Sequence, residues 1–204
     1  MTRERGRPRS FDIDAALDSA LAVFWRHGFL DASLSELTAA MGLSKPSLYA
    51  AFGDKASLYL KALDRYVTLR IAPHMQALAD TPDGYQAIEG FLTGLAAMLS
   101  DPALPGGCFI VTGSTDIGAA GLPQDIDRAL RSALQASEVH LKARLARALT
   151  EGDLPPGTDV DELAGLFSAL LAGLAIQARA GVSTQRLHRL ISNAMRAWPQ
   201  ARAA

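Results

Sequence analysis

The chain has 204 residues, of which 49% are hydrophobic and 20% charged, with a formal net charge of −1. This composition excludes a mostly disordered or collagen-like chain, and the single cysteine, Cys108, excludes an intrachain disulfide. The longest apolar run, 163–176, is shorter than the roughly 18 residues that a membrane-spanning helix needs. The arginine-rich N-terminus has no long apolar run directly behind it, which argues against a secretory signal. We therefore expect a soluble, intracellular protein.

Positive charge is concentrated near the N-terminus. Residues 1–70 contain 10 Lys and Arg against 8 Asp and Glu, whereas residues 71–204 contain 10 against 13. Within the first nine residues a single glutamate accompanies four arginines, which are Arg3, Arg5, Arg7 and Arg9. Such an arm can attract phosphates or enter a minor groove, although four arginines are also compatible with a solvated chain end.

Short helices are predicted first in the chain. Asp12 can cap a helix whose apolar residues recur at three- and four-residue spacing, and Gly28 occupies a position typical of a helix C-terminus. A capping box then opens a second helix at Ser33, and Gly42 ends it. The second helix is expected to span 34–41.

A third and a fourth helix follow directly. Ser44 can cap the third, which carries Pro46 in its first turn, where a missing N–H costs nothing, and ends near Gly53. Asp54 can cap a long fourth helix with an apolar stripe. We expect this fourth helix to continue without a break to about Ala79.

The rest of the chain also predicts helices. The short segment 107–119 contains β-branched residues, but an isolated strand would have nothing to pair with, so we expect a short helix there. We find no internal repeat and no low-complexity linker. The fold class is therefore predicted to be all-α, with later helices over about 83–99, 123–151, 160–180 and 183–197.

The second and third helices are separated by a tight turn at Gly42. A short helix, a tight turn with glycine and a second helix is the arrangement of a helix-turn-helix. Hydroxyls, a cation and a helix N-terminus can bind phosphates and base edges. The third helix would present such groups at Ser44, Lys45, Pro46, Ser47 and Tyr49. By spacing alone, an ordinary helical hairpin with polar exposed residues is an equally good interpretation.

Four motifs strengthen the first interpretation. They are Phe24–Gly28–Phe29, Leu37–Gly42–Leu43–Ser44, Leu48–Tyr49–Phe52 and Lys55–Leu58. Over about residues 10–63 the sequence resembles the N-terminal DNA-binding domain of the TetR family of transcriptional regulators. The resemblance implies a basic arm at 1–9, a three-helix helix-turn-helix domain at 10–55 and a helical ligand-binding and dimerisation domain at 56–204.

The resemblance also implies which residues contact DNA. Tyr49 and Lys55 match phosphate-contacting positions, and Ser33 and Ser35 lie where the second helix approaches the DNA backbone. Many members carry large side chains after the tyrosine, where this chain has two alanines, so specificity would depend on few base contacts and on DNA shape. The predicted DNA-binding residues are Arg5, Arg7, Arg9, Ser33, Ser35, Ser44, Lys45, Pro46, Ser47, Tyr49 and Lys55.

The last two helices are the candidates for a homodimer interface. The first is apolar on nearly every face and the second carries one apolar stripe. Packed against their copies they would form a four-helix bundle, although both could instead be buried in their own subunit. The predicted interface residues are Leu163, Leu166, Leu170, Gly173, Leu174, Leu187, Leu190, Ile191, Met195 and Trp198.

A ligand pocket is expected between the middle helices. The stretch from Gly106 to Gly118 also resembles a motif that a TetR subgroup carries near its pocket. The predicted lining residues are Phe91, Leu95, Met98, Cys108, Phe109, Thr112, Leu134, Leu141 and Phe167, each of which could equally be ordinary core.

Cys108 could be a redox sensor or could bind a soft metal together with His74, His140 or Met98. No Cys-x-x-Cys or His-x-x-x-His spacing supports a metal site, and an apolar-flanked cysteine is most often a small buried hydrophobe. We therefore predict no metal and no cofactor. A small helical enzyme or ligand carrier is the weaker alternative, because no catalytic triad or phosphate-binding glycine loop is visible.

The predicted function is that of a dimeric repressor that binds a near-palindromic operator in double-stranded DNA. An unidentified small-molecule ligand would bind between the middle helices and favour a conformer that cannot hold both half-sites, with the fourth helix as the lever. A transcriptional activator, a nucleoid-type binder and a thiol- or metal-responsive regulator using Cys108 remain alternatives.

Overall fold

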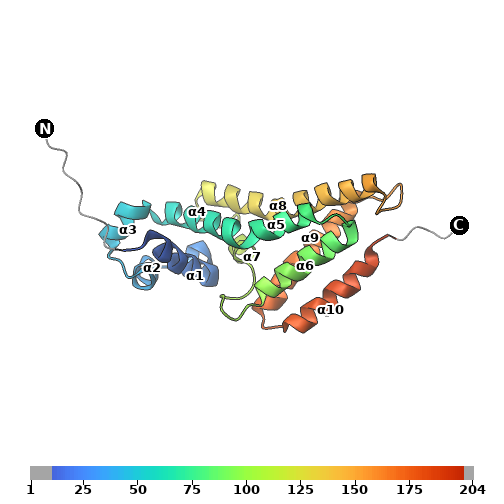
Figure 1. Cartoon of the computed structure of the whole chain (residues 1–204). Helices are drawn as coiled ribbons and strands as arrows, with labels where there is room; N and C mark the ends of the chain where they lie inside the picture. Colours follow the sequence, from blue (N-terminus) through green and yellow to red (C-terminus); the bar gives the residue numbers. More distant parts are fainter. Residues whose placement is uncertain (1–10, 200–204) are drawn as a thin grey trace.

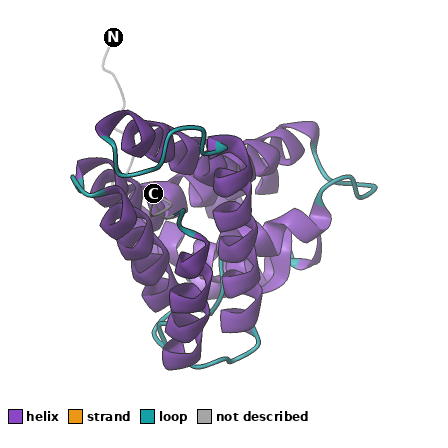
Figure 2. Cartoon of the chain, turned by 90° about the vertical axis from the view of Figure 1, so that its right-hand side faces the viewer, coloured by secondary structure: helices purple, strands orange, loops and turns teal. Residues whose placement is uncertain are grey.

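The computed structural model describes residues 11–199, and each regular element in that range is a helix, which confirms the all-α fold class (Figures 1 and 2). Helices α1 (Ile13–Asp31), α2 (Leu34–Met41) and α3 (Lys45–Phe52) gather at one end of an elongated molecule (Figure 1). Helix α4 (Lys55–Tyr66) leads from this group toward the longer helices at the other end.

Helix α1 continues for one turn beyond the expected end at Gly28. Gly28 has φ 75° and ψ −171°, which breaks the helix without ending it. Only glycine adopts this backbone conformation readily. The N-terminus of α1 is as predicted, because the Asp12 carboxylate accepts hydrogen bonds from the backbone N–H groups of Asp14 and Ala15.

The caps predicted for α2 and α3 are confirmed. Ser33 and Glu36 form both hydrogen bonds of a capping box, and Gly42 ends α2 in the left-handed conformation at φ 64°. The Ser44 hydroxyl accepts a hydrogen bond from the backbone N–H of Ser47. The turn between the two helices therefore has the geometry that the sequence predicted.

The long fourth helix that the sequence predicted is in fact interrupted. A π-helical turn, η1 (Val67–Ile71), separates α4 from α5 (Ala72–Asp80), and the N–H of Ala72 bonds to the carbonyl of Val67, five residues back. Pro73 explains the interruption, because it has no N–H to donate and its ring clashes with a regular helical turn. The wider turn relieves that conflict while the chain stays helical.

The remaining elements follow the predicted order. They are α6 (Gly84–Leu99), α7 (Phe109–Gly113), η2 (Ser114–Asp116), α8 (Gln124–Glu151), α9 (Val160–Arg179), α10 (Thr184–Ala194) and η3 (Met195–Ala197). One hydrophobic core lies among α1 to α4, α7 and the start of α8, and a second lies among α5, α6 and α8 to α10. Ile71, Met98 and Cys108 pack against both cores, which places α7 at the junction.

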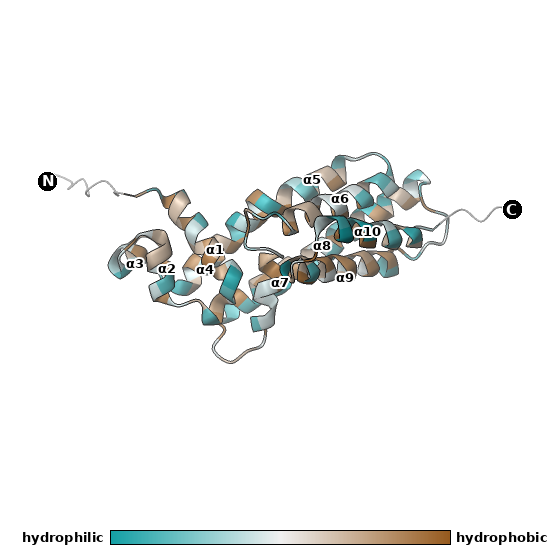
Figure 3. Cartoon of the chain, turned by 90° about the horizontal axis from the view of Figure 1, so that it is seen from below, coloured by the Kyte–Doolittle hydropathy of each residue, from teal (hydrophilic) through white to brown (hydrophobic). Residues whose placement is uncertain are grey.

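Helix α9 is long and apolar enough to cross a membrane by length and composition. The helix meets these criteria because it extends on both sides of the run 163–176, and the added residues include the charged Asp161, Glu162 and Arg179. The apolar run itself remains shorter than about 18 residues. Hydropathy colouring shows α9 as mostly apolar and α10 as largely polar (Figure 3). In the fold, α9 packs against α6, α8 and α10, and a core helix meets the same length and composition criteria.

Candidate functional site

The helix-turn-helix presents a polar surface at its outer end. Lys45 and Pro46 in the first turn of α3 are exposed, and Tyr49 is 46% exposed one turn later. The opposite face of α3 holds the helix in place through Leu48 and Phe52, which are buried in the first core. The core thus fixes α3 while its polar groups remain free to contact another molecule.

Serines on α2 and α3 combine exposure with capping roles. Ser33 and Ser35 at the start of α2 are exposed, as is Ser44 before α3. Ser47 is half-buried, and its Oγ lies 2.9 Å from that of Ser44. The structure therefore brings these predicted residues to one end of the molecule, where α2 and α3 meet.

Lys55 has a less open position than the other predicted residues. Its Nζ donates to the carbonyl of Leu30 over 3.4 Å and lies 4.5 Å from the ring centroid of Phe29. Burial lowers the pKa of Lys55, and the negative charges of Asp116 and Asp31 oppose that shift. The ammonium group thus joins the start of α4 to the end of α1. Arg5, Arg7 and Arg9 lie outside the described residues.

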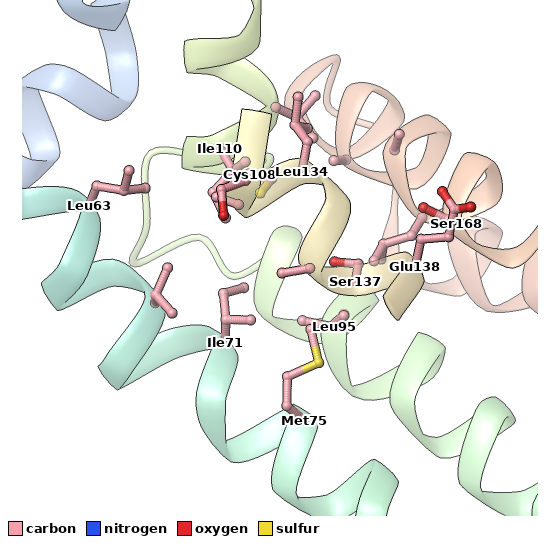
Figure 4. Close-up of a pocket in the computed structure, with 18 of the residues that line it drawn as sticks. Leu63, Ile71, Met75, Leu95, Cys108, Ile110, Leu134, Ser137, Glu138 and Ser168 are labelled. Carbon is pink, nitrogen blue, oxygen red and sulfur yellow. The ribbon is translucent and has the colours of Figure 1, made fainter. Parts of the chain in front are cut away.

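A cavity of about 720 Å³ lies between the two cores (Figure 4). Its walls come from α4, η1, α5, α6, α7, α8 and α9. Four of the predicted lining residues do line it, and they are Leu95, Met98, Cys108 and Leu134. The cavity therefore lies between the middle helices, as the sequence predicted.

Five predicted lining residues do not line this cavity. Phe91, Leu141 and Phe167 are buried within the second core, where they hold the helices together. Phe109 packs 5.2 Å from the ring of Tyr59 in an aromatic cluster. Thr112 accepts a hydrogen bond from α9, as described below. The three phenylalanines among the five are therefore in the cores, whereas the cavity wall is formed mostly by aliphatic, thioether and small side chains.

Sequence reasoning missed most of the small residues in the wall. Helix α8 contributes Ala129, Ala133 and Ala136, and α9 contributes Gly165 and Ala172. In a sequence, a small residue that faces a void has the same pattern as one that lets two helices approach closely. Helical spacing predicts which residues share one face of a helix, but it does not predict whether that face lies against a cavity or against another helix.

Cys108 is the residue of the cavity wall with the most distinctive contact. The hydroxyl of Tyr66 donates to its Sγ over 3.2 Å. Burial raises the pKa of the Cys108 thiol, so the group is a thiol at neutral pH. Among residues 11–199 no group of three His, Cys, Asp or Glu side chains could hold a metal ion. His140 instead lies 2.6 Å from the carbonyl of Ala136 on its own helix.

The break in α1 is contacted by an arginine from the far end of α9. Arg179 donates from Nη1 to the carbonyl of Trp25 over 3.1 Å and from Nη2 to that of Arg26 over 2.8 Å. Its Nη1 also donates to Oγ1 of Thr112 on α7, over 2.8 Å. A cation at the carbonyl end of a helical segment is stabilised by the helix dipole. The first part of α1 is therefore capped by α9 before Gly28.

The turn that follows Gly28 is capped by a carboxylate. Asp116 Oδ2 accepts hydrogen bonds from the backbone N–H groups of Phe29, over 2.8 Å, and Leu30, over 3.2 Å. An anion at the N–H end of a helical turn is favoured by the same dipole. Asp116 belongs to η2, directly after α7, so both sides of the break are held by elements from the C-terminal part of the chain.

The residues of the predicted dimer interface differ in how much surface they offer to a partner. Six of the ten are already buried within their own subunit: Leu163, Leu174, Leu187, Ile191, Met195 and Trp198. Leu170 and Leu190 are half-buried, and Leu166 and Gly173 are exposed. Ile176, which was not predicted, is 60% exposed on α9. The apolar stripe of α10 faces its own core because α10 packs on α6 and α9.

The fold and the polar surface of α3 define a helix-turn-helix protein with a separate helical domain that encloses a cavity. Residues 16–62 match the family described as bacterial regulatory proteins, tetR family. Residues 84–194 match the tetracyclin repressor-like C-terminal domain. The chain therefore belongs to the TetR family and is a DNA-binding transcriptional regulator.

Several relatives are similar over nearly the whole chain. The transcriptional repressor ComR of Escherichia coli K12 is 33% identical over 97% of this chain and 94% of its own. The repressor BdcR of the same organism is 28% identical over 91% and 88%. The structure of a cysteine-substituted CifR, a TetR family regulator in complex with 26-base-pair operator DNA, has a TM-score of 0.88 and 35% identity, and the match covers 95% of this chain and 100% of that one.

Proposed function

We propose that the protein is a homodimeric repressor that binds a near-palindromic operator and is released from it by a small-molecule ligand. The observation that carries this proposal is the course of α4. This helix begins beside α3 at Lys55 and supplies Leu60, Leu63 and Asp64 to the cavity wall. A ligand that moved this wall would therefore also move the helix on which the recognition helix rests.

The names of the relatives support the direction of regulation. ComR and BdcR are both called repressors, and the structure of a cysteine-substituted CifR is a complex with operator DNA. The protein is proposed to act in the bacterial cytoplasm, where a chromosomal operator is accessible. An activator would bind DNA through the same surface, so the outcome of a transcription assay separates the two.

Two features support dimerisation: the small size of a single helix-turn-helix and an exposed apolar stripe on α9. One helix-turn-helix makes too few contacts for a specific site, and a symmetric dimer doubles them on two half-sites. On α9, Leu166 is 47% exposed and Ile176 is 60% exposed, with Gly173 between them. We propose that this stripe, rather than the buried residues of α10, packs against its copy in the partner.

The test begins with an operator selected by the full-length protein from random duplex DNA, with a scrambled duplex as the control. We expect at least about a 10³-fold preference for the selected site at moderate salt. Lys45→Ala and Tyr49→Ala should each weaken operator binding by about tenfold, because each removes one DNA contact. Lys61→Ala, an exposed lysine on α4, is the matched control and should have little effect.

Equal binding to both duplexes that disappears as salt rises would contradict the proposal, because it would show backbone attraction alone. A reporter placed behind the selected operator then reports the direction of regulation. Lower reporter expression in the presence of the protein supports a repressor, and higher expression would show an activator.

A further inference from the structure

The charges around the cavity have one sign. Its lining includes two carboxylates from exposed residues, Asp64 on α4 and Glu138 on α8, and within the described residues no lysine, arginine or histidine lines it. Within residues 11–199 neither carboxylate forms an ion pair, and the cation nearest in sequence to Glu138, Lys142, is paired with Asp161. An anion entering the cavity would therefore find repulsion and no counter-ion.

Most polar groups of the cavity lie on one side. Ser137 and Glu138 from α8 lie close to Ser168 from α9 (Figure 4). The opposite wall, from α4, η1, α5 and α6, contributes Asp64 and otherwise presents aliphatic and thioether side chains that include Ile71 and Met75. A ligand would therefore be held by apolar contact over most of its surface and could form hydrogen bonds at the side of the serines.

We propose that the cavity binds an uncharged, mostly apolar molecule with a hydrogen-bonding group at one end, and that Asp64 and Glu138 exclude anions. The physical reason is that a buried anion without a paired cation loses its hydration and receives nothing in return. The two carboxylates add a smaller repulsion, because both belong to exposed residues and are partly screened by water and salt. This inference concerns the ligand of the proposed repressor and rests on that function.

The test uses two fluorescent probes with the same ring system. N-phenyl-1-naphthylamine is uncharged, and 1-anilinonaphthalene-8-sulfonate carries one negative charge. The full-length protein should bind the uncharged probe more tightly. Asp64→Asn and Glu138→Gln should each raise the affinity for the sulfonate by about threefold and leave that for the uncharged probe unchanged.

Two further variants serve as controls. Asp80→Asn removes an exposed carboxylate that does not line the cavity, so it should change neither affinity. Ala172→Phe should reduce binding of the uncharged probe, because it fills the cavity wall. Equal binding of both probes, no binding of the uncharged probe, or no effect of both charge-removing variants would overturn the inference. Binding of the uncharged probe without any change in operator affinity would support the ligand class and contradict ligand release.

A second inference rests on separate contacts. Helix α7 and the segment before it supply Cys108, Ile110 and Val111 to the cavity wall, and α9 supplies Ala175, four residues before Arg179. The two groups that cap the break in α1, Arg179 and Asp116, are thus attached to elements that also form the cavity wall.

Close packing makes this connection stiff. A Cβ on Gly107 would lie 3.0 Å from the carbonyl oxygen of Ala175, and one on Gly113 would collide with the hydroxyl of Tyr59. Helix α7 therefore fits between α9 and α4 with no room for a methyl group, so movement of the wall must displace its neighbours.

From these contacts we infer that Asp116 and Arg179 transmit cavity occupancy to α1, and through Leu30 to the start of α2 at Ser33. They are positioning residues, because neither lines the cavity and neither belongs to the helix-turn-helix. This route acts beside the lever α4 and also rests on the proposed function.

The test measures coupling by reciprocity, since a probe that weakens operator binding must itself be weakened by operator. The affinity for N-phenyl-1-naphthylamine is measured with and without the selected operator. We expect the dissociation constant of the probe to be about fivefold or more higher with operator than without it in the unmodified protein. In Asp116→Asn and Arg179→Met the ratio of these two dissociation constants should fall toward one, while the protein still binds each partner alone.

Asp127→Asn is the matched control, because Asp127 accepts hydrogen bonds from Gly118 and Arg131 in the same region without contacting α1. Its ratio should equal that of the unmodified protein. The inference would be overturned if operator did not change the affinity for the probe in the unmodified protein. It would also be overturned if Asp116→Asn and Arg179→Met both kept the full effect of operator on probe affinity. Because the two substitutions remove contacts from different elements, failure of one variant to fold leaves the other as a test.

Discussion

At the scale of single residues, Gly28 determines how the helix-turn-helix domain (α1 to α3) is joined to the C-terminal part of the chain. Its backbone conformation, φ 75° and ψ −171°, turns the chain between two capped segments of α1. A Cβ at this position would lie 2.9 Å from Oδ2 of Asp116, the atom that accepts the hydrogen bonds of Phe29 and Leu30. Glycine is therefore required here both by the backbone angles and by the neighbouring carboxylate.

We predict that Gly28→Ala lowers the free energy of unfolding by about 2–3 kcal/mol, because strain and displacement of Asp116 add. Denaturant unfolding followed by circular dichroism measures the effect. Gly42→Asn is the matched control, since its φ of 64° suits asparagine and no atom lies within 4 Å of the added Cβ. Equal losses in the two variants would contradict the role given to Asp116.

At the scale of elements, the interruption after α4 shapes the cavity. The π-helical turn carries Val67 and Ile71 into the cavity wall, and Met75 follows one turn later on α5. The cause, Pro73, was visible in the sequence, but the apolar stripe that leads up to it favoured one long helix. A proline inside a helical pattern predicts a break, and only the surrounding packing decides whether the chain bends, unwinds or widens.

An exposed ion pair adds to the core packing between α1 and α4. Arg65 Nε lies 2.5 Å from Oδ1 of Asp18, and its Nη1 lies 3.0 Å from Oδ1 of Asp14. The hydrogen bond from Arg65 lowers the pKa of Asp18 below 3.8. A carboxylate with a lowered pKa stabilises the folded state above its unfolded pKa, and this contribution is lost as the pH falls through the folded value.

We predict that Asp18→Asn lowers the free energy of unfolding at pH 7 by about 0.5 kcal/mol, the size expected for a surface pair. The difference from the unmodified protein should shrink as the pH falls below 3.8 and should decrease with added salt. Denaturant unfolding at a series of pH values measures it. Arg65→Met should abolish the same pH-dependent difference, and a difference that persisted in acid would contradict this account.

At the scale of the whole molecule, the two cores meet at α7 and leave one apolar stripe of α9 uncovered. Leu166 and Ile176 are exposed on this stripe, with Gly173 between them where two helices can approach closely. The cavity also reaches α9, through Gly165 and Ala172. A partner packed on α9 would therefore lie beside the ligand.

We predict that Leu166→Arg combined with Ile176→Arg converts a dimer into monomers, because two charges would be buried in an apolar contact. Sedimentation equilibrium measures the mass, and operator affinity should fall by at least about 100-fold, because only one half-site is then held. Leu69→Arg, at a residue of η1 that is 49% exposed, is the control and should leave the mass unchanged. A monomeric unmodified protein would contradict the proposed assembly.

The helix caps and the turn of the helix-turn-helix domain could be predicted from the sequence, because each depends on residues that are close together in the chain. The caps at Asp12, Ser33 and Ser44 and the left-handed Gly42 depend on residues within four positions of each other. The family motifs in the same region also consist of residues that are close together in the chain. The lining of the cavity was only partly predictable, because Leu95 and Phe91 lie four residues apart on α6 and only packing decides that one lines the cavity and the other does not.

The sequence by itself determined the all-helical class, the order of the helices and the helix-turn-helix, since periodicity and capping are written in short stretches of chain. Only the tertiary structure decided which apolar faces are satisfied within the subunit, as Leu187 and Ile191 are and Ile176 is not. It also brought Asp116 and Arg179 to the two sides of Gly28, over separations of 87 and 153 residues in their hydrogen bonds to Phe29 and Arg26. Such contacts depend on how distant elements pack, and no local pattern specifies that packing.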